Sequence, residues 1–206
     1  MNDLHGSGLL RGSLVAVFLS ALLLPPGAAA PRVDHEAACT YKTLSWDDFR
    51  GPVISGQQVA WIAATIVLEP FEVEVVQQGD SWVAKVDYPE VYALMDKLQS
   101  SARRGGRTEA NLAHEQTHFD IAEYEARKLA LEVREIRAMG EEDSLDLRIV
   151  LQEKVSVAYA TALRALLQHQ QLYDGETGHG TRKKPQKKWQ REVAELLEQT
   201  EPYKLF

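Results

Sequence analysis

Apolar and polar positions follow two different periods along this chain. In the first half, residues 59–68 are rich in β-branched side chains, and residues 71–76 and 81–86 alternate apolar with polar positions. Alternation with a period of two is typical of half-buried strands. Residues 78–80, which read Q-G-D, form a turn signal between the last two segments. The pattern therefore predicts three strands, the last two as a hairpin.

The second half of the chain has the period of helices. It predicts a modest helix over residues 90–102, followed by a long helix from the N-cap Thr108 to about Ala138. A second long helix is predicted over residues 144–172 and a last helix over residues 185–199. In each of the three longer predicted helices, apolar residues recur at steps of three and four, so each has one face for a core.

Together these elements predict an α+β fold, in which a small antiparallel sheet precedes a helical body. A short loop at Gly140 should pack the two long helices antiparallel as a helical hairpin. Residues 31–56 are predicted to be irregular, with Trp46 and Phe49 covering an edge of the core. The chain of 206 residues suggests one domain over residues 31–206.

Charge and the N-terminus add two expectations. The net charge of −7 argues against nucleic acid as the main partner. Residues 1–30 are predicted to be a signal peptide, because Arg11 precedes an apolar run over residues 13–24 and small residues follow it. That run is shorter than the about 20 residues of a membrane span. We therefore expect an exported chain, periplasmic or secreted, with no stable transmembrane span in its mature form; an uncleaved anchor is the alternative.

A metal-binding motif lies near the start of the first long helix. Residues 114–118 read H-E-Q-T-H, so His114 and His118 lie one helical turn apart and can reach one ion. Glu115 can reach a water on that metal without being a ligand. The apolar seam of the helix, traced backward from Phe119, reaches the motif and places it on the core side. The alternative is a pair of histidines that only pack or face solvent.

A catalytic zinc needs a third protein ligand, and the chain has only six histidines. Two of them lie in or close to the predicted signal peptide, and His169 falls on the seam of the second long helix, where packing is the commoner role. The predicted hairpin brings the segment after that helix back beside the motif. Geometry thus favours a ligand from this segment, which offers Asp174, Glu176 and His179.

Four stretches of the chain resemble the motifs of one bacterial family. Residues 44–51 read L-S-W-D-D-F-R-G, residues 114–121 read H-E-Q-T-H-F-D-I, residues 173–180 fit Y-D-x-E-T-x-H-G, and residues 186–189 fit Q-x-x-W. In this order they resemble a family of predicted secreted zinc-dependent proteases (domain of unknown function 922). The protease label of that family is itself inferred from the H-E-x-x-H motif. The loop over residues 103–107 and the helix predicted before it look longer than usual in the family.

The resemblance implies a zincin-like site in which Zn²⁺ is held by His114, His118 and His179. It adds weight to His179 over the two acidic alternatives in the same segment. Asp120 is a candidate for orienting a ligand histidine, although a helical surface acid is about as common. Tyr173 is a candidate donor to an oxyanion, although an aromatic side chain at a helix end more often packs.

These residues predict a zinc-dependent metallopeptidase or amidase. Zinc would lower the pKa of its bound water to about 7, and Glu115 would take the proton and pass it to the leaving amine. The expected substrate is a peptide, a protein or a cell-wall amide, and the oligomeric state is not predicted. The main alternative is an exported, non-catalytic zinc-binding or cell-envelope interaction protein. A third interpretation assigns the basic run over residues 182–188 to anionic lipid or cell-wall polymer, although such a run is usually a solvated helix start.

Overall fold

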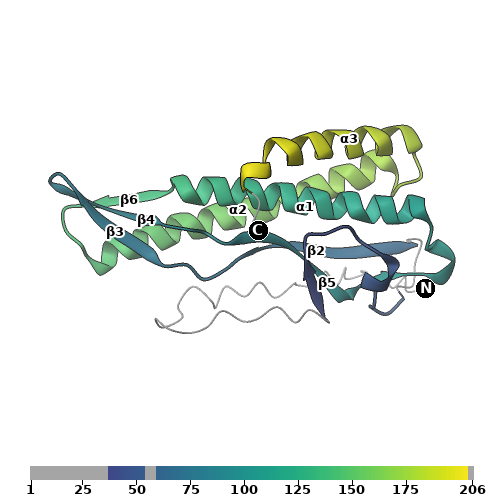
Figure 1. Ribbon diagram of the computed structural model, residues 1–206, viewed down its shortest axis with the longest axis horizontal. Coiled ribbons are helices and arrows are strands. Elements are labelled where there is room, and N and C mark those ends of the chain that lie inside the picture. Colours follow the sequence, from purple (N-terminus) through teal and green to yellow (C-terminus); the bar gives the residue numbers. More distant parts are fainter. Residues whose placement is uncertain (1–36, 54–58, 204–206) are drawn as a thin grey trace, which may run out of the picture.

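The computed structural model describes residues 37–53 and 59–203 (Figure 1). The predicted signal peptide lies outside the described residues. None of the helices in the described part of the chain combines the length and the apolarity that a bilayer crossing needs. The elements are, in chain order, β1 (Ala38–Thr40), η2 (Trp46–Asp48), β2 (Ala60–Leu68), β3 (Val73–Gln78), β4 (Ser81–Val86), β5 (Val91–Ala102), η3 (Arg104–Gly106), α1 (Glu109–Glu135), β6 (Arg137–Gly140), α2 (Leu145–Thr177), α3 (Lys183–Gln199) and η4 (Glu201–Tyr203).

The described strands form two antiparallel sheets of three strands each, with the orders β1-β5-β2 and β3-β4-β6. The molecule is elongated, and α1 and α2 run along its length (Figure 1). The β3-β4-β6 sheet extends from one end, while α3 packs on α1 and α2 toward the other end. The α+β class is confirmed, and so is the hairpin of β3 and β4; the single small sheet of the prediction is in fact two.

Helix α1 is the centre of the molecule, because it packs against β2 and β5 as well as against α2 and α3. Five residues of its predicted apolar seam are at most 1% exposed, namely Phe119, Ala122, Ala126, Leu129 and Val133, whereas the sixth, Ile136, caps the end of the helix and is only partly buried. The N-cap prediction is also confirmed, since the Thr108 side chain accepts a hydrogen bond from the backbone N–H of Asn111. Because α1 is packed between a sheet and two helices, the backbone that bears its side chains is held in place.

The helix predicted over residues 90–102 is wrong, because this segment forms strand β5. The side chains of Val91, Ala93 and Met95 are buried and the residues between them are less so, which is a period of two. The segment contains good helix formers, and their propensity favoured the helical reading. Pairing with β1 on one edge and β2 on the other outweighs that propensity.

The prediction that the first long helix runs to about Ala138 and ends in a short loop at Gly140 is wrong for residues 137–140. They form strand β6, in which Ala138 is paired with Ala84 of β4. The two long helices are therefore joined by a strand and a turn. They still run antiparallel, so the predicted helical hairpin brings the end of α2 back to the start of α1 (Figure 1).

Helix α2 ends later than predicted, at Thr177 instead of residue 172. Its end is set by Gly178, which has a left-handed backbone with φ of 57°. Tyr173 and Asp174 therefore lie in the last turns of a helix, and the loop that follows is shorter than the sequence suggested. This difference decides which side chains can reach the histidines.

Candidate metal centre

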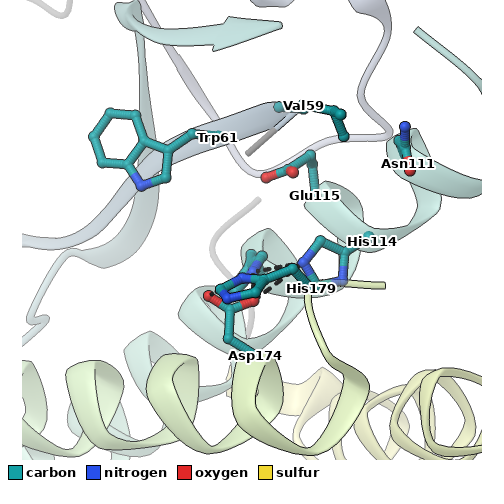
Figure 2. A pocket seen from close by; sticks show the side chains of 9 residues that line it. Val59, Trp61, Asn111, His114, Glu115, Asp174 and His179 are labelled. Carbon is teal, nitrogen blue, oxygen red and sulfur yellow. Dashed lines mark hydrogen bonds and ion pairs between the residues drawn. The ribbon is translucent and has the colours of Figure 1, made fainter. Parts of the chain in front are cut away.

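Two helices bring together three side chains of the kinds that can ligate a metal ion; Figure 2 shows His114 and Asp174 among them. His114 and His118 come from the start of α1, and Asp174 comes from the end of α2. The two Nε2 atoms are 3.2 Å apart, and Asp174 Oδ1 lies 3.1 Å from that of His114 and 3.0 Å from that of His118. Among the described residues, these are the only histidine, cysteine and acidic side chains grouped closely enough to hold a metal ion.

The other ring nitrogen of each histidine faces an amide oxygen. Nδ1 of His114 lies 3.1 Å from Gln186 Oε1, and Nδ1 of His118 contacts Gln170 Oε1. The orientation of each amide is set by its nitrogen, which donates to the Tyr173 hydroxyl from Gln186 and to the His118 carbonyl from Gln170. Because an amide oxygen can only accept, each Nδ1 carries the proton.

With both rings in that tautomer, three acceptors face one another: two Nε2 lone pairs and the Asp174 carboxylate. Such atoms repel at about 3 Å unless a proton or a metal ion lies between them. Burial opposes both charges, yet the hydrogen bond to Asp174 raises the pKa of His114. The same bond and the one from His118 outweigh burial and hold the pKa of Asp174 well below its usual range.

The donor set fits zinc, which takes nitrogen and carboxylate ligands and leaves one position open in catalytic sites. The amide oxygens behind both rings are the kind of support that metal-bound histidines have. The cavity beside these donors has a volume of about 30 Å³, which is room for a water molecule or an ion.

Glu115 lines this cavity without joining the three donors (Figure 2). Its side chain is only 4% exposed and accepts a hydrogen bond from the backbone N–H of Ile62 on β2. Burial raises the pKa of Glu115, although the neighbouring histidines oppose the shift. The predicted general base thus stands beside the predicted ligands, with a raised proton affinity.

His179 lies at the same cavity but contacts a different atom. Its Nδ1 is 3.3 Å from Asp174 Oδ2, whereas His114 and His118 contact Oδ1, and its side chain is 56% exposed. Its backbone is left-handed, with φ of 51°, and the next residue, Gly180, is packed so closely that a Cβ would lie 3.1 Å from the His114 ring. The assignment of His179 as a ligand stays a prediction.

Of the three side chains offered by the segment, Asp174 has the oxygen that approaches both histidines. Glu176 instead accepts a hydrogen bond of 2.8 Å from the indole N–H of Trp189. Sequence reasoning kept Asp174 open as an alternative, and it missed Gln170, which lies one helical turn before Asp174. The sequence shows that Gln170 and Asp174 are four residues apart. This spacing places both side chains on one helix face only if the helix continues past residue 172, as it does to Thr177.

Two further candidates have structural contacts. Asp120 accepts hydrogen bonds from the Tyr41 hydroxyl at 2.9 Å and from Gln116 Nε2 at 2.8 Å, so it ties the N-terminal segment to α1. Tyr173 is fully buried, and its ring stacks on that of His114 with the centroids 4.8 Å apart. Its hydroxyl donates to the His114 carbonyl at 3.3 Å. Tyr173 therefore supports the first turns of α1 by packing.

Residues 81–180 match the family model described as "Bacterial protein of unknown function (DUF922)". The similarity to this family is thus carried by the segment from strand β4 to just past the end of helix α2. The DUF922 match confirms the resemblance read from the sequence, and it contains the three donors and Glu115. Trp46 and the pair Gln186 and Trp189 lie outside the matched segment. Neither the curated proteins nor the solved structures gave a match to this chain.

Proposed function

We propose that this DUF922 protein is an exported zinc-dependent metallopeptidase or amidase. One observation carries the proposal: three acceptor atoms meet beside a buried carboxylate, and the amides behind the rings keep the facing nitrogens free of protons. We assign His114, His118 and Asp174 as ligands and Glu115 as general base. Export rests on the predicted signal peptide.

A bound divalent ion supplies a Lewis acid, which acidifies water and polarises a carbonyl group. The chain supplies the rest. Gln186 and Gln170 hold the imidazole rings in the tautomer that binds a cation. A Glu115 carboxylate oxygen accepts the proton of the attacking water and returns it to the leaving amine, and a raised pKa suits a base that works near neutral pH.

A second candidate function is favoured by the position of His179. If its ring turned from Asp174 Oδ2 toward the three donors, it would act as a fourth ligand and close the site. Closed four-ligand sites are structural. The protein would then be an exported, non-catalytic zinc-binding or cell-envelope protein, which was the main alternative from the sequence.

The experiment compares wild type, Glu115→Gln and His118→Ala after zinc reconstitution. Metal analysis should find one zinc per chain in wild type and Glu115→Gln, and none in His118→Ala. Hydrolysis of a peptide pool and of cross-linked peptidoglycan fragments should be seen with wild type and fall about 10²–10⁴-fold in Glu115→Gln, which is the range for a lost general base. X-ray absorption should count two imidazole ligands.

Each outcome separates the candidates. Three imidazole ligands, with no hydrolysis by wild type, would favour the structural zinc. A wild-type chain that binds no zinc would exclude both functions. A Glu115→Gln variant that keeps zinc and full hydrolysis would show that the site is catalytic by another route and that Glu115 is not the base.

A further inference from the structure

We propose that Trp61 and Val59 form an apolar subsite that binds an apolar side chain of the substrate next to the bond that is cleaved. The inference rests on the proposed function and names the substrate class. The cavity beside Glu115 holds about 30 Å³, which is room for a water but not for a side chain. A substrate must therefore lie across the mouth of the cavity, and the residues at the mouth select it.

The mouth has two unlike sides. On one side, Val59, just before β2, and Trp61, at its start, are 41% and 39% exposed; in Figure 2, Val59 lies above Glu115 and Trp61 lies to its left. The other lining includes polar groups, Asn111 and His179. Single exposed apolar residues are common on protein surfaces and need no explanation. Two of them at one mouth, two residues apart in the sequence, offer a contact area for an apolar group.

An irregularity in the sheet fixes this strand against Glu115. Trp61 is paired with Ser101 and Ala63 with Asp96. Between these two pairs, β2 has one residue, Ile62, while β5 has the four residues 97–100. The ladder is interrupted there, and the Ile62 N–H donates to Glu115 instead. Sheet irregularities of this kind are common next to active sites, where they reorient a side chain. Here the residue that donates to Glu115, Ile62, directly follows Trp61 in the chain.

Val59 is held as firmly as Trp61. Its carbonyl accepts a hydrogen bond of 2.9 Å from the backbone N–H of Arg103. Gly106 lies so close that a Cβ there would be 2.8 Å from Val59 Cβ. Since both residues are positioned before any substrate arrives, the subsite loses little conformational freedom on binding.

The charges around the subsite indicate which substrates it rejects. No lysine or arginine is among the described residues that line the cavity, so an acidic substrate side chain placed on Trp61 and Val59 would lose water without gaining a cation of the chain. An apolar side chain has no such cost and covers Trp61 and Val59 from water. We therefore expect apolar residues beside the cleaved bond and expect aspartate or glutamate there to be disfavoured.

The kinetic test uses peptide pairs that differ in one residue beside the cleaved bond, phenylalanine or aspartate. In Trp61→Ala, kcat/KM for the phenylalanine peptide should fall roughly tenfold or more, because a large hydrophobic contact is lost. The same constant for the aspartate peptide should change little, and Trp61→Phe should keep most of the preference. The matched control is Leu167→Ala, an exposed apolar residue on α2 outside this pocket. An equal loss for both peptides would overturn the proposal.

A binding test needs no turnover. The chain has four tryptophans, and the indole N–H signal that disappears from the NMR spectrum of Trp61→Phe identifies Trp61. Titration with N-acetylphenylalaninamide should shift this signal, while N-acetylaspartamide should not. A signal unmoved by the phenylalanine amide, or moved equally by both amides, would overturn the subsite. A chain without zinc or hydrolysis would defeat the proposed function and leave this readout intact, so the two failures are distinguishable.

Discussion

Helix α1 carries two groups of buried ionisable side chains, and they differ in how their charge is balanced. In its middle, Glu123 pairs with Arg127 at 2.9 Å, and Glu125 pairs with Lys128 at 3.0 Å and with His169 at 2.8 Å. Near its start, His114 and His118 meet Asp174 of α2, so that three acceptor atoms face one another. Burial of polar groups is common to both, so burial does not mark a functional site.

What separates the two groups is the origin of the positive charge. The carboxylates in the middle of α1 find cations of the chain itself. The two Nε2 atoms and the Asp174 oxygen near its start have no such cation, since each ring donates its Nδ1 proton to an amide oxygen. A group that balances itself stabilises the fold, whereas one that lacks a cation is a place to bind one. Four predictions follow from this contrast, beginning with the largest effect.

Arg127→Leu should reduce the free energy of unfolding by about 3–5 kcal/mol, because it leaves the Glu123 carboxylate buried without its partner. Arg127 is only 3% exposed and also donates to the Leu197 carbonyl at 2.8 Å, which ties α1 to the end of α3. Urea denaturation of the zinc-free protein measures the change. The zinc content of the folded variant should stay at that of wild type.

The matched control is Arg191→Leu, which removes an exposed arginine paired with Glu195 at 3.8 Å. Exposed pairs of this kind contribute about 0–1 kcal/mol, so the control should be nearly neutral. Loss of zinc from folded Arg127→Leu would contradict the separation of the two groups on α1.

Gln186→Leu should weaken zinc binding about 10–100-fold, or by about 1.4–2.7 kcal/mol, because the His114 ring loses the acceptor that fixes its tautomer. Competition with a chromophoric chelator measures the affinity. The control is Gln190→Leu on the same helix, whose amide donates to the Ala113 carbonyl at 3.4 Å and contacts no histidine ring among the described contacts. An equal loss in both variants would mean that α3 acts through packing alone.

The pH dependence of stability should have opposite sign with and without zinc. In the zinc-free protein the pKa of His114 is raised, so its contribution is present below the ordinary value of 6.5 and is lost as the pH rises through the folded-state pKa. The pKa of Asp174 is lowered, so its contribution is present above 3.8 and is lost as the pH falls through the folded-state pKa. The metal-free cluster therefore stabilises the fold most between these two values.

Zinc needs neutral imidazoles, so its binding improves as the pH rises. The difference in Tm between zinc-loaded and zinc-free protein should therefore grow from about pH 5 to about pH 8. Thermal unfolding at several pH values measures it, and Asp174→Asn should flatten the dependence. A difference in Tm that stays constant with pH would speak against these histidines as the ligands.

The part of the site that lies within one helical turn could be predicted from the sequence, because the spacing of His114 and His118 and the N-cap Thr108 are local properties of α1. The third donor depended on where α2 ends. The helical period was followed only to residue 172, while hydrogen bonds of the last turn and the left-handed Gly178 carry the helix to Thr177. That extension places Asp174 one helical turn after Gln170, so that both side chains reach the histidines.

Strand β5 shows a second kind of limit. Its residues prefer helix as isolated segments, and they form the central strand only because β1 and β2 pair with both edges. Both partners are distant in sequence, and β1 has only three residues, so it gave no strand signal of its own. The interruption of this sheet beside Ile62, which serves Glu115, could not be predicted for the same reason.

Asp120→Asn should have the smallest effect, within about 0.5 kcal/mol of wild type or slightly stabilising at neutral pH. Burial and the nearby charge of Glu123 raise the pKa of Asp120, although its bonds to Gln116 and Tyr41 oppose the shift, so the charged form gains nothing from folding. Asparagine keeps an oxygen that can accept both of these hydrogen bonds and removes the repulsion from Glu123.

Zinc affinity decides what Asp120 does. Among the described contacts this carboxylate bonds to Tyr41 and Gln116 and to neither ring of the candidate metal site, so Asp120→Asn should bind zinc as wild type does. The control is Gln186→Leu, which touches the cluster directly. If Asp120→Asn instead loses zinc affinity about tenfold, Asp120 orients a ligand histidine through Gln116. Asp120 would then belong with the residues that support the candidate metal site.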